Sequence, residues 1–274
     1  MRIDRSAELA DEAAAQANRR RLALLCLIPS AIVGLVLGVI VAVLGFVVVA
    51  LVVLVAVTVA LAAWIRATAA SRVVSALGAR PSLEADRPRL HNLVEGLCAT
   101  MGLDRPEIWV VDSPLANALV VGRDAHRTTL VVTSGLEERL SLVELEGVLA
   151  HELVHVKRDD AAVAAVAVQV ASLWGRIAGE AAGESAVHRW CGAGREFAAD
   201  QRAAQVVRYP DGIAGALASM AAEESDAPWP PGAGRLARCT RWLWIDPLAG
   251  VAPAGDGTGD LDDTRVRAAA LTVR

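Results

Sequence analysis

Two histidines four residues apart, with a glutamate directly after the first, form the pattern in this sequence that is best suited to chemistry. They are His151, Glu152 and His155. Residues four apart on an α-helix lie only about 40° from each other around its axis, so both imidazoles can reach one metal ion. Neutral imidazole suits Zn²⁺, and a catalytic zinc ion takes three protein ligands and keeps one position for water. Glu152 can accept a proton from that water, so the motif predicts two metal ligands together with their general base.

The sequence around this motif predicts a helix that begins near Leu142. Apolar residues recur through it at helical spacing, and Ser141 with Glu144 fits a capping box at its N-terminus. The competing interpretation is a helix that carries surface histidines and a glutamate by chance. The apolar surface of the same stretch favours the metal site, because it indicates a helix held against a core.

A catalytic zinc ion needs a third protein ligand, and Glu196 is the best candidate. It stands four residues before Asp200, in a segment that opens the next predicted helix. A carboxylate from a second helix would complete a set of two histidines and one glutamate. Asp200 lies one turn further on the same face, where it can accept a hydrogen bond from a ligand imidazole and fix its tautomer. An exposed Glu and Asp pair on a helix surface is the alternative that spacing alone leaves open.

Residues 178–194, rich in Gly, Ala and Glu, are predicted to form a mobile loop before that helix. The segment contains His188 and Cys191. A lone histidine and a lone cysteine in such a loop are not expected to be metal ligands.

The stretch from Leu22 to Ile65 contains no charged residue. As a single helix it would be about 66 Å long, twice the roughly 30 Å hydrocarbon core of a bilayer. The sequence therefore predicts two membrane-spanning helices, at about residues 22–42 and 46–65, joined by a tight turn. Gly34 and Gly38 form a G-x-x-x-G pattern, which either lets the two helices approach closely or reflects the ordinary use of glycine in membranes.

Arginines flank both ends of this hairpin, Arg19–Arg21 before it and Arg66 and Arg72 after it. Two crossings put both flanks on the same side, which the positive-inside rule makes the cytoplasm. The four cysteines are scattered without a C-x-x-C pattern, which agrees with a reducing compartment. A net charge of −4 without a long basic run argues against a nucleic-acid partner. We therefore expect a multi-pass protein of the cell (inner) membrane with its catalytic domain in the cytoplasm.

Beyond the hairpin the composition is that of a globular domain. Leu83–Met101 predicts an amphipathic helix. Residues 106–112, 118–121 and 128–133 predict strands that would form a small antiparallel sheet beside the zinc helix. Residues 161–174 predict a buried core helix, with an interfacial or partly membrane-inserted helix as the alternative.

Taken in order along the chain, these features resemble the HtpX-type membrane zinc metalloproteases, relatives of the prenyl-protein (CAAX) endopeptidases. A membrane hairpin precedes the catalytic domain in both. Residues 117–122 (Asn-Ala-Leu-Val-Val-Gly) are similar to a strand of that family, and 156–159 (Val-Lys-Arg-Asp) continue its zinc helix. Residues 196–200 (Glu-Phe-Ala-Ala-Asp) match its third-ligand segment. The resemblance covers roughly residues 20–225.

The resemblance implies a role for five residues. His151, His155 and Glu196 would bind zinc, and Glu152 would be the catalytic base. Asn117 would lie on an edge strand that binds extended polypeptide substrate by β-augmentation. The resemblance also implies hydrolysis of peptide bonds in the quality control of membrane or misfolded proteins.

The C-terminal tail departs from the family pattern, in which a His-Pro pair is followed by Arg-Ile. Arg265 and Val266 fit the Arg-Ile end, but Gly259 and Asp260 occupy the positions of His and Pro. Arg265 is expected to remain as a fixed positive charge near the developing oxyanion, a catalytic role, whereas the contribution of the histidine is lost.

We therefore predict an α+β fold, in which a zincin-like, mainly helical metalloprotease domain with a small antiparallel sheet follows a two-helix transmembrane hairpin. The predicted function is that of a membrane-anchored, zinc-dependent metalloendopeptidase. The alternative, prompted by the altered tail, is a catalytically impaired zinc-binding module, tethered to the membrane for interaction or regulation. The predicted segments are an N-terminal cytoplasmic segment with a short helix (1–21), the transmembrane hairpin (22–66), the metalloprotease core (67–225) and a C-terminal loop and tail that complete the domain (226–274).

Overall fold

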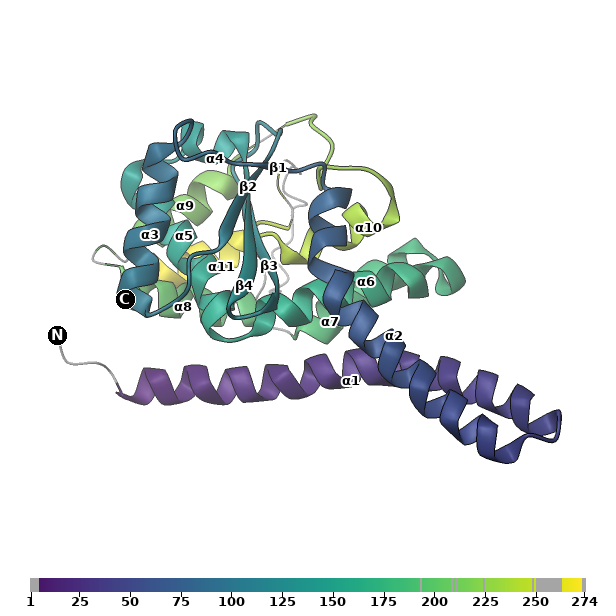
Figure 1. The fold of residues 1–274 in the computed structure, drawn as a ribbon. Helices are drawn as coiled ribbons and strands as arrows, with labels where there is room; N and C mark the ends of the chain where they lie inside the picture. Colours follow the sequence, from purple (N-terminus) through teal and green to yellow (C-terminus); the bar gives the residue numbers. More distant parts are fainter. Residues whose placement is uncertain are drawn as a thin grey trace.

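Two long helices and a body of helices around a small sheet make up the protein in a computed structural model (Figure 1). The structure describes residues 5–192, 194–207, 209, 211–223, 225–247, 249 and 263–272. The elements are, in order, α1 (Arg5–Val43), α2 (Val47–Ala76), β1 (Arg80–Pro81), α3 (Pro88–Met101), β2 (Glu107–Val111), β3 (Ala118–Asp124), β4 (Arg127–Thr133), α4 (Ser134–Arg139), α5 (Leu142–Lys157), α6 (Asp160–Ala178), α7 (Glu180–Cys191), α8 (Arg195–Val206), α9 (Asp211–Ala221), α10 (Gly234–Cys239), the 3₁₀ turn η1 (Arg241–Leu243) and α11 (Thr264–Thr272).

The hairpin of α1 and α2 packs closely through small residues. A Cβ atom added at Gly34 would lie 2.5 Å from Oγ1 of Thr58 and 2.7 Å from the carbonyl oxygen of Leu54. One added at Gly38 would lie 3.2 Å from the carbonyl oxygen of Ala50. The G-x-x-x-G pattern therefore marks a close contact between the two helices, which a larger residue would prevent.

The outer surface of this hairpin is apolar and exposed. Large aliphatic side chains are exposed along the residues from Leu24 to Val59, and Val48 is 81% exposed. By length and composition α1, α2 and α6 could each cross a membrane. Most of α6 is buried in the body, which agrees with the core helix predicted over 161–174, whereas the tip of the hairpin projects away from the body (Figure 1). By length and composition, the α1–α2 hairpin is therefore the candidate membrane anchor of the protein.

Helix α1 continues without a break through the polar residues that precede the membrane segment. The sequence predicts a separate short helix over 1–21, but the structure has one helix from Arg5 to Val43. Residues 5–28 contain no glycine or proline and are rich in alanine, so nothing in them ends a helix.

The polar half of α1 runs along the body (Figure 1) and is attached to it by a shared carboxylate. Asp11 is 2% exposed. Its two oxygens accept hydrogen bonds at 2.8 Å from Nε of Arg158 and at 2.8 Å from Nε of Arg202. Arg158 directly follows α5 and Arg202 belongs to α8, so one side chain of α1 contacts both of these regions of the body.

The sheet has the strand order β1-β2-β4-β3. The pair of β3 with β4 is antiparallel, as predicted, and so is the pair of β2 with β1, a short strand that the sequence does not predict. The central pair, β2 with β4, is parallel, with Trp109 opposite Val131. After β2 the chain crosses to the opposite edge of the sheet, where it forms β3. Strand β4 then returns between them, so β2 pairs with β4 rather than with β3. The sheet is therefore mixed, while the predicted α+β class with a helical majority is confirmed.

Both faces of the sheet are covered, which explains why its strands are apolar throughout. Along β3, Val120 belongs to an apolar cluster formed with α3, α5 and α9, whereas Leu119 and Val121 belong to one formed with α6 and the base of the hairpin. Successive side chains of a strand point to opposite faces, so each face carries its own set of contacts.

Helix α5 begins with the predicted capping box. The Oγ of Ser141 accepts a hydrogen bond from the backbone N–H of Glu144, and the Glu144 carboxylate accepts one at 2.8 Å from the backbone N–H of Ser141. Two of the N–H groups that a helix leaves unpaired at its start are thereby satisfied. The start of the helix that carries His151 and His155 is thus fixed by residues within four positions of each other.

The prediction of a loop over residues 178–194 is wrong, because most of this segment forms helix α7. Its glycines permit a close contact between helices: a Cβ atom added at Gly183 would lie 3.2 Å from Cα of Gly175 on α6. The alanines and glutamates around them favour a helix once that contact exists.

Replacing Asp11 by alanine should loosen α1 from the body. The change removes the carboxylate shared by Arg158 and Arg202, and loss of one partner of a buried ion pair costs about 3–5 kcal/mol. Both arginines can still reach solvent, so we expect the lower end of that range, measured as a lower thermal unfolding midpoint of detergent-purified protein. The control is Glu12→Ala, which removes an exposed carboxylate from the next position of the same helix. Equal midpoints for the two variants would contradict this account of α1.

Candidate metal centre

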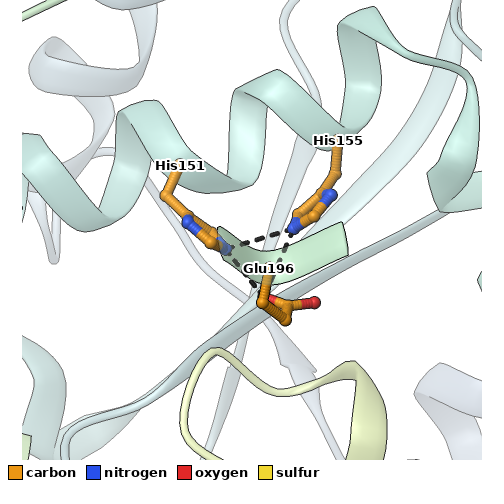
Figure 2. A group of neighbouring side chains, drawn as sticks. All are labelled: His151, His155 and Glu196. Carbon is orange, nitrogen blue, oxygen red and sulfur yellow. Dashed lines mark hydrogen bonds and ion pairs between the residues drawn. The ribbon is translucent and has the colours of Figure 1, made fainter. Parts of the chain in front are cut away.

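Helices α5 and α8 bring His151, His155 and Glu196 together (Figure 2). The Nε2 atoms of the two histidines lie 3.1 Å apart. Oε2 of Glu196 lies 2.9 Å from Nε2 of His151 and 3.5 Å from Nε2 of His155. All three residues are at most 5% exposed. The spacing of four puts both imidazoles on one face of α5, and the glutamate reaches them from the first turn of α8.

Two carboxylates hold the other ring nitrogens of the histidines. Nδ1 of His151 lies 2.8 Å from Oδ1 of Asp200, and Nδ1 of His155 lies 2.9 Å from Oδ2 of Asp160. Asp200 stands one turn after Glu196 on α8, and Asp160 is the first residue of α6. With each Nδ1 atom held in this way, each Nε2 atom is directed toward Glu196. Carboxylates orient the imidazole ligands of metal sites in the same way.

Two arginines balance these carboxylates, namely Arg267, which is buried, and Arg195, whose side chain is 11% exposed. Arg267 of α11 donates hydrogen bonds at 2.6 and 2.8 Å to the two oxygens of Asp200. Arg195 donates at 2.9 Å to Oε1 of Glu196, which leaves Oε2 directed toward the histidines. Burial raises the pKa of Glu196 and of Asp200, but the charges of Arg195 and Arg267 outweigh it and hold both pKa values below the usual range. Both carboxyl groups are therefore ionised at neutral pH.

The same carboxylates make the histidines more basic. Burial lowers the pKa of His155, but Asp160 raises it more, and the resulting pKa is about 9. Burial also lowers the pKa of His151, and Asp200 outweighs it, so that this pKa is raised as well. A metal ion binds neutral imidazole and must therefore displace protons from this cluster.

Glu152 lies beside the cluster as a buried carboxylate without a partner. It is 1% exposed, and neither of its carboxylate oxygens has a hydrogen-bond partner in the part of the chain that the structure describes. Burial raises its pKa to about 7, although the two histidines lower it. A general base works best with a pKa near the working pH, so Glu152 has the environment that this role needs.

The side chains present fit a zinc ion. The candidate ligand atoms of His151, His155 and Glu196 all lie within 4.8 Å of one another. Two imidazole nitrogens and one carboxylate oxygen are a donor set that catalytic zinc uses. The unpartnered oxygens of Glu152 next to this set provide an acceptor for a water molecule. The geometry therefore suits metal-assisted hydrolysis.

Asn117 lies directly before the edge strand β3, and its side chain is fully buried. Its Nδ2 donates at 2.7 Å to the carbonyl oxygen of Asp246, and its Oδ1 accepts at 3.2 Å from the backbone N–H of the same residue. The backbone N–H of Ile245 donates to the carbonyl oxygen of Ala118 at 3.0 Å. Asn117 thus attaches the segment before the tail to the start of the edge strand.

The structure does not bring Arg265 to the cluster. Its side chain is exposed and donates at 3.1 Å to the carbonyl oxygen of Ala221, so the expected position near an oxyanion is not supported. Residues two apart on a helix point in nearly opposite directions, and Arg267, two positions later, is the arginine of α11 that faces the cluster. Gly259 and Asp260, which replace the family's His-Pro pair, lie outside the described residues.

The sequence analysis does not predict three residues that contact the cluster, namely Asp160, Arg195 and Arg267. Asp160 follows His155 by five residues, and Arg195 precedes Glu196, so proximity in sequence is a signal for both. Arg267 has no such signal, because its contact depends on how α11 packs. His188 stacks on Trp242, with ring centroids 4.4 Å apart, and does not join the cluster.

Comparison with known proteins agrees with this site. The model of peptidase family M48 matches residues 84–243, which is more than half of the chain and includes the whole His-His-Glu cluster. No solved structure matches.

Several curated proteins named protease HtpX homolog are similar to this chain. That of Tropheryma whipplei (strain TW08/27) is 36% identical over 173 residues, which cover 52% of this chain and 60% of the relative. That of Dictyoglomus turgidum is 33% identical over 174 residues, covering 53% and 57%. Protease HtpX homolog 2 of Methanosarcina mazei is 41% identical over 96 residues, covering 35% and 33%. The chain thus spans up to 60% of the length of these relatives, and the resemblance to the HtpX type is confirmed.

Replacing Asp160 by asparagine should weaken zinc binding about 10- to 100-fold, because the carboxylate that holds Nδ1 of His155 becomes a neutral amide. Competition with a chromophoric chelator measures this affinity. Asp159→Asn is the matched control, since Asp159 pairs with Arg19 at 2.6 Å and, in the described part of the chain, forms no hydrogen bond or ion pair with His151 or His155. Asparagine also tolerates the left-handed conformation of that position, where φ is 55°. Equal zinc affinity in Asp160→Asn and the wild type would show that Asp160 does not orient the ligand.

Proposed function

Because the chain belongs to peptidase family M48, we propose that it is a membrane-anchored metalloendopeptidase that hydrolyses peptide bonds of polypeptides. The observation that carries the proposal is the unpartnered, buried carboxylate of Glu152 beside the convergent cluster of His151, His155 and Glu196. A module that only binds zinc has no use for that carboxylate, whereas hydrolysis needs a proton acceptor at this place. The names of the similar proteins, all proteases, favour the enzyme over the impaired binding module as well.

We assign the metal to zinc, held by His151, His155 and Glu196. A bound zinc ion supplies a Lewis acid that acidifies water and polarises the scissile carbonyl group. Asp200 and Asp160 act as positioning residues, because they fix which nitrogen of each imidazole faces the metal.

Glu152 carries the proton in this proposal. As the nucleophilic water attacks the carbonyl carbon, its carboxylate takes a proton from that water, and it later gives a proton to the nitrogen of the leaving amine. A pKa of about 7, raised by burial, suits both transfers. Arg267 contributes indirectly, since it holds Asp200 in place.

The substrate would approach along the edge strand β3. The cluster is nearly inaccessible to solvent, so a polypeptide reaches it only if a covering segment moves. We propose that Asn117 serves by holding Asp246 against the start of β3, and thereby shapes one end of the path for an extended chain. Unfolded or damaged membrane and cytoplasmic proteins are the proposed substrates, since an extended segment is what an edge strand binds.

The hairpin would place this site in the cytoplasm. Arg20 and Arg66 flank the two apolar segments on the side of the body, and positively charged flanks remain on the cytoplasmic side. The body lies on the side of these flanks (Figure 1), so the proposed enzyme faces the cytoplasm.

Replacing Glu152 by glutamine should abolish proteolysis and leave zinc bound. Loss of a general base lowers the rate by about 10²- to 10⁴-fold, while the three metal ligands stay intact. The measurement is cleavage of casein by detergent-purified protein with one equivalent of zinc, beside the zinc content of the same sample. Glu146→Gln, on the same helix but partly exposed, should keep its activity. Undiminished cleavage by Glu152→Gln would refute the assigned base.

A further inference from the structure

A cavity of about 300 Å³ lies where α2, α6 and α10 meet, on the part of the body next to the hairpin. Helix α10 packs against both α2 and α6. The side chains around the cavity are mainly basic or polar, and those the argument uses are Arg72, Arg176, Arg235, Gln169 and Ser172. The proposed peptidase chemistry uses none of them.

The cavity carries an excess of positive charge. In the described part of the chain, Arg72 and Arg176 have no carboxylate within ion-pair distance. The guanidinium of Arg235 is 3.6 Å from Oε1 of Glu180, an oxygen that also pairs with Arg238. Of the three guanidinium groups, Arg235 pairs with a carboxylate in the described part of the chain, and that carboxylate also pairs with Arg238. Guanidinium groups match the geometry of phosphate oxygens, so a phosphate group would suit this excess of positive charge.

A buried amide under the cavity also lacks a partner. Gln169 is 2% exposed, and neither its side-chain oxygen nor its side-chain nitrogen forms a hydrogen bond with any residue that the structure describes. Buried amides are normally satisfied, because an unpaired one costs free energy. This unpaired amide on the cavity wall is an observation independent of the arginines, and it also indicates a polar ligand.

The cavity lies near the end of the apolar segment of α2. The guanidinium of Arg72 stacks on the ring of Trp64, 4.3 Å from its centroid, and Trp64 lies at the end of the apolar segment of α2. At the end of α6, Leu173 and Trp174 are each 47% exposed and Ile177 is 83% exposed. Exposed aromatic and aliphatic side chains beside the end of an apolar helical segment are typical of a membrane interface.

We propose that this cavity binds the phosphate group of an anionic phospholipid from the leaflet on the side of the body. Arg72, Arg176 and Arg235 would surround the phosphate, Gln169 and Ser172 would add hydrogen bonds, and the exposed residues of α6 would contact the acyl chains. Basic pockets beside membrane helices bind anionic headgroups by the same forces. The site lies on α6, whose first residue Asp160 holds His155, so its ligand would be bound to the helix that also supports the metal centre.

The test is native mass spectrometry of the full chain, released from a nonionic detergent and titrated with phosphatidylglycerol or with phosphatidylcholine of the same acyl chains. We expect the wild type to retain phosphatidylglycerol in preference to phosphatidylcholine. In Arg72→Gln/Arg176→Gln that retention should weaken by about 10- to 30-fold, the size expected for two basic residues near an anionic headgroup. Gln169→Leu, which changes no charge, should weaken it as well.

The control removes the same number of charges near the membrane but away from the cavity. Arg20→Gln/Arg66→Gln changes two exposed arginines that flank the membrane segments, and it should retain the lipid as the wild type does. An equal loss in this control would show general attraction of basic residues to lipid and would overturn the proposal. A further arm measures the thermal unfolding midpoint with inorganic phosphate. If inorganic phosphate raises the midpoint as much as phosphatidylglycerol does, and Arg72→Gln/Arg176→Gln removes that increase, the cavity binds a soluble phosphate. That result would overturn the proposed lipid ligand.

Discussion

The structure depends on a set of buried charged groups, each of which is stable in the interior because it pairs with a group of opposite charge. Glu196 and Asp200 are ionised in the interior, which is tolerable because Arg195 and Arg267 form hydrogen bonds with them. The two histidines then fill the space between these carboxylates. Among the described residues neither carboxylate oxygen of Glu152 has a hydrogen-bond partner, and the Nε2 atoms of the two histidines beside it lie 3.1 Å apart. A divalent cation among these donors would complete the balance of charge, and it would give the cluster a chemical use.

The members of this cluster come from segments far apart in the sequence, and α1 joins two of those segments. Its Asp11 pairs with Arg158, at the end of α5, and with Arg202, on α8. These are the helices that carry the histidines and the glutamate of the candidate metal centre. Helix α1 is continuous from these contacts into the membrane segment. Helix α1 therefore connects the candidate membrane anchor to the two regions of the body that carry the candidate metal ligands.

The features that could be predicted from the sequence are those that depend on spacing within one element. The pair His151 and His155 needs only the period of a helix, and the hairpin needs only an uncharged stretch of the right length. What could not be predicted depends on packing between elements. Arg265 and Arg267 differ only in which side of α11 faces the cluster, and the sequence contains no signal for that rotation. The same applies to the parallel pairing of β2 with β4, and to α7, whose glycines indicate a loop until a second helix packs against them.

The account rests on a zinc ion bound by two imidazoles and one carboxylate, and X-ray absorption at the zinc edge tests this most directly. The sample is the full chain in detergent, loaded with one equivalent of zinc. We predict a ligand shell of nitrogen and oxygen only, at about 2.0–2.2 Å, with the multiple-scattering signature of two imidazoles. His155→Ala should reduce that signature to one imidazole. A sulfur neighbour at about 2.3 Å, or an unchanged spectrum in the variant, would contradict the assigned ligands and with them the proposed reaction centre.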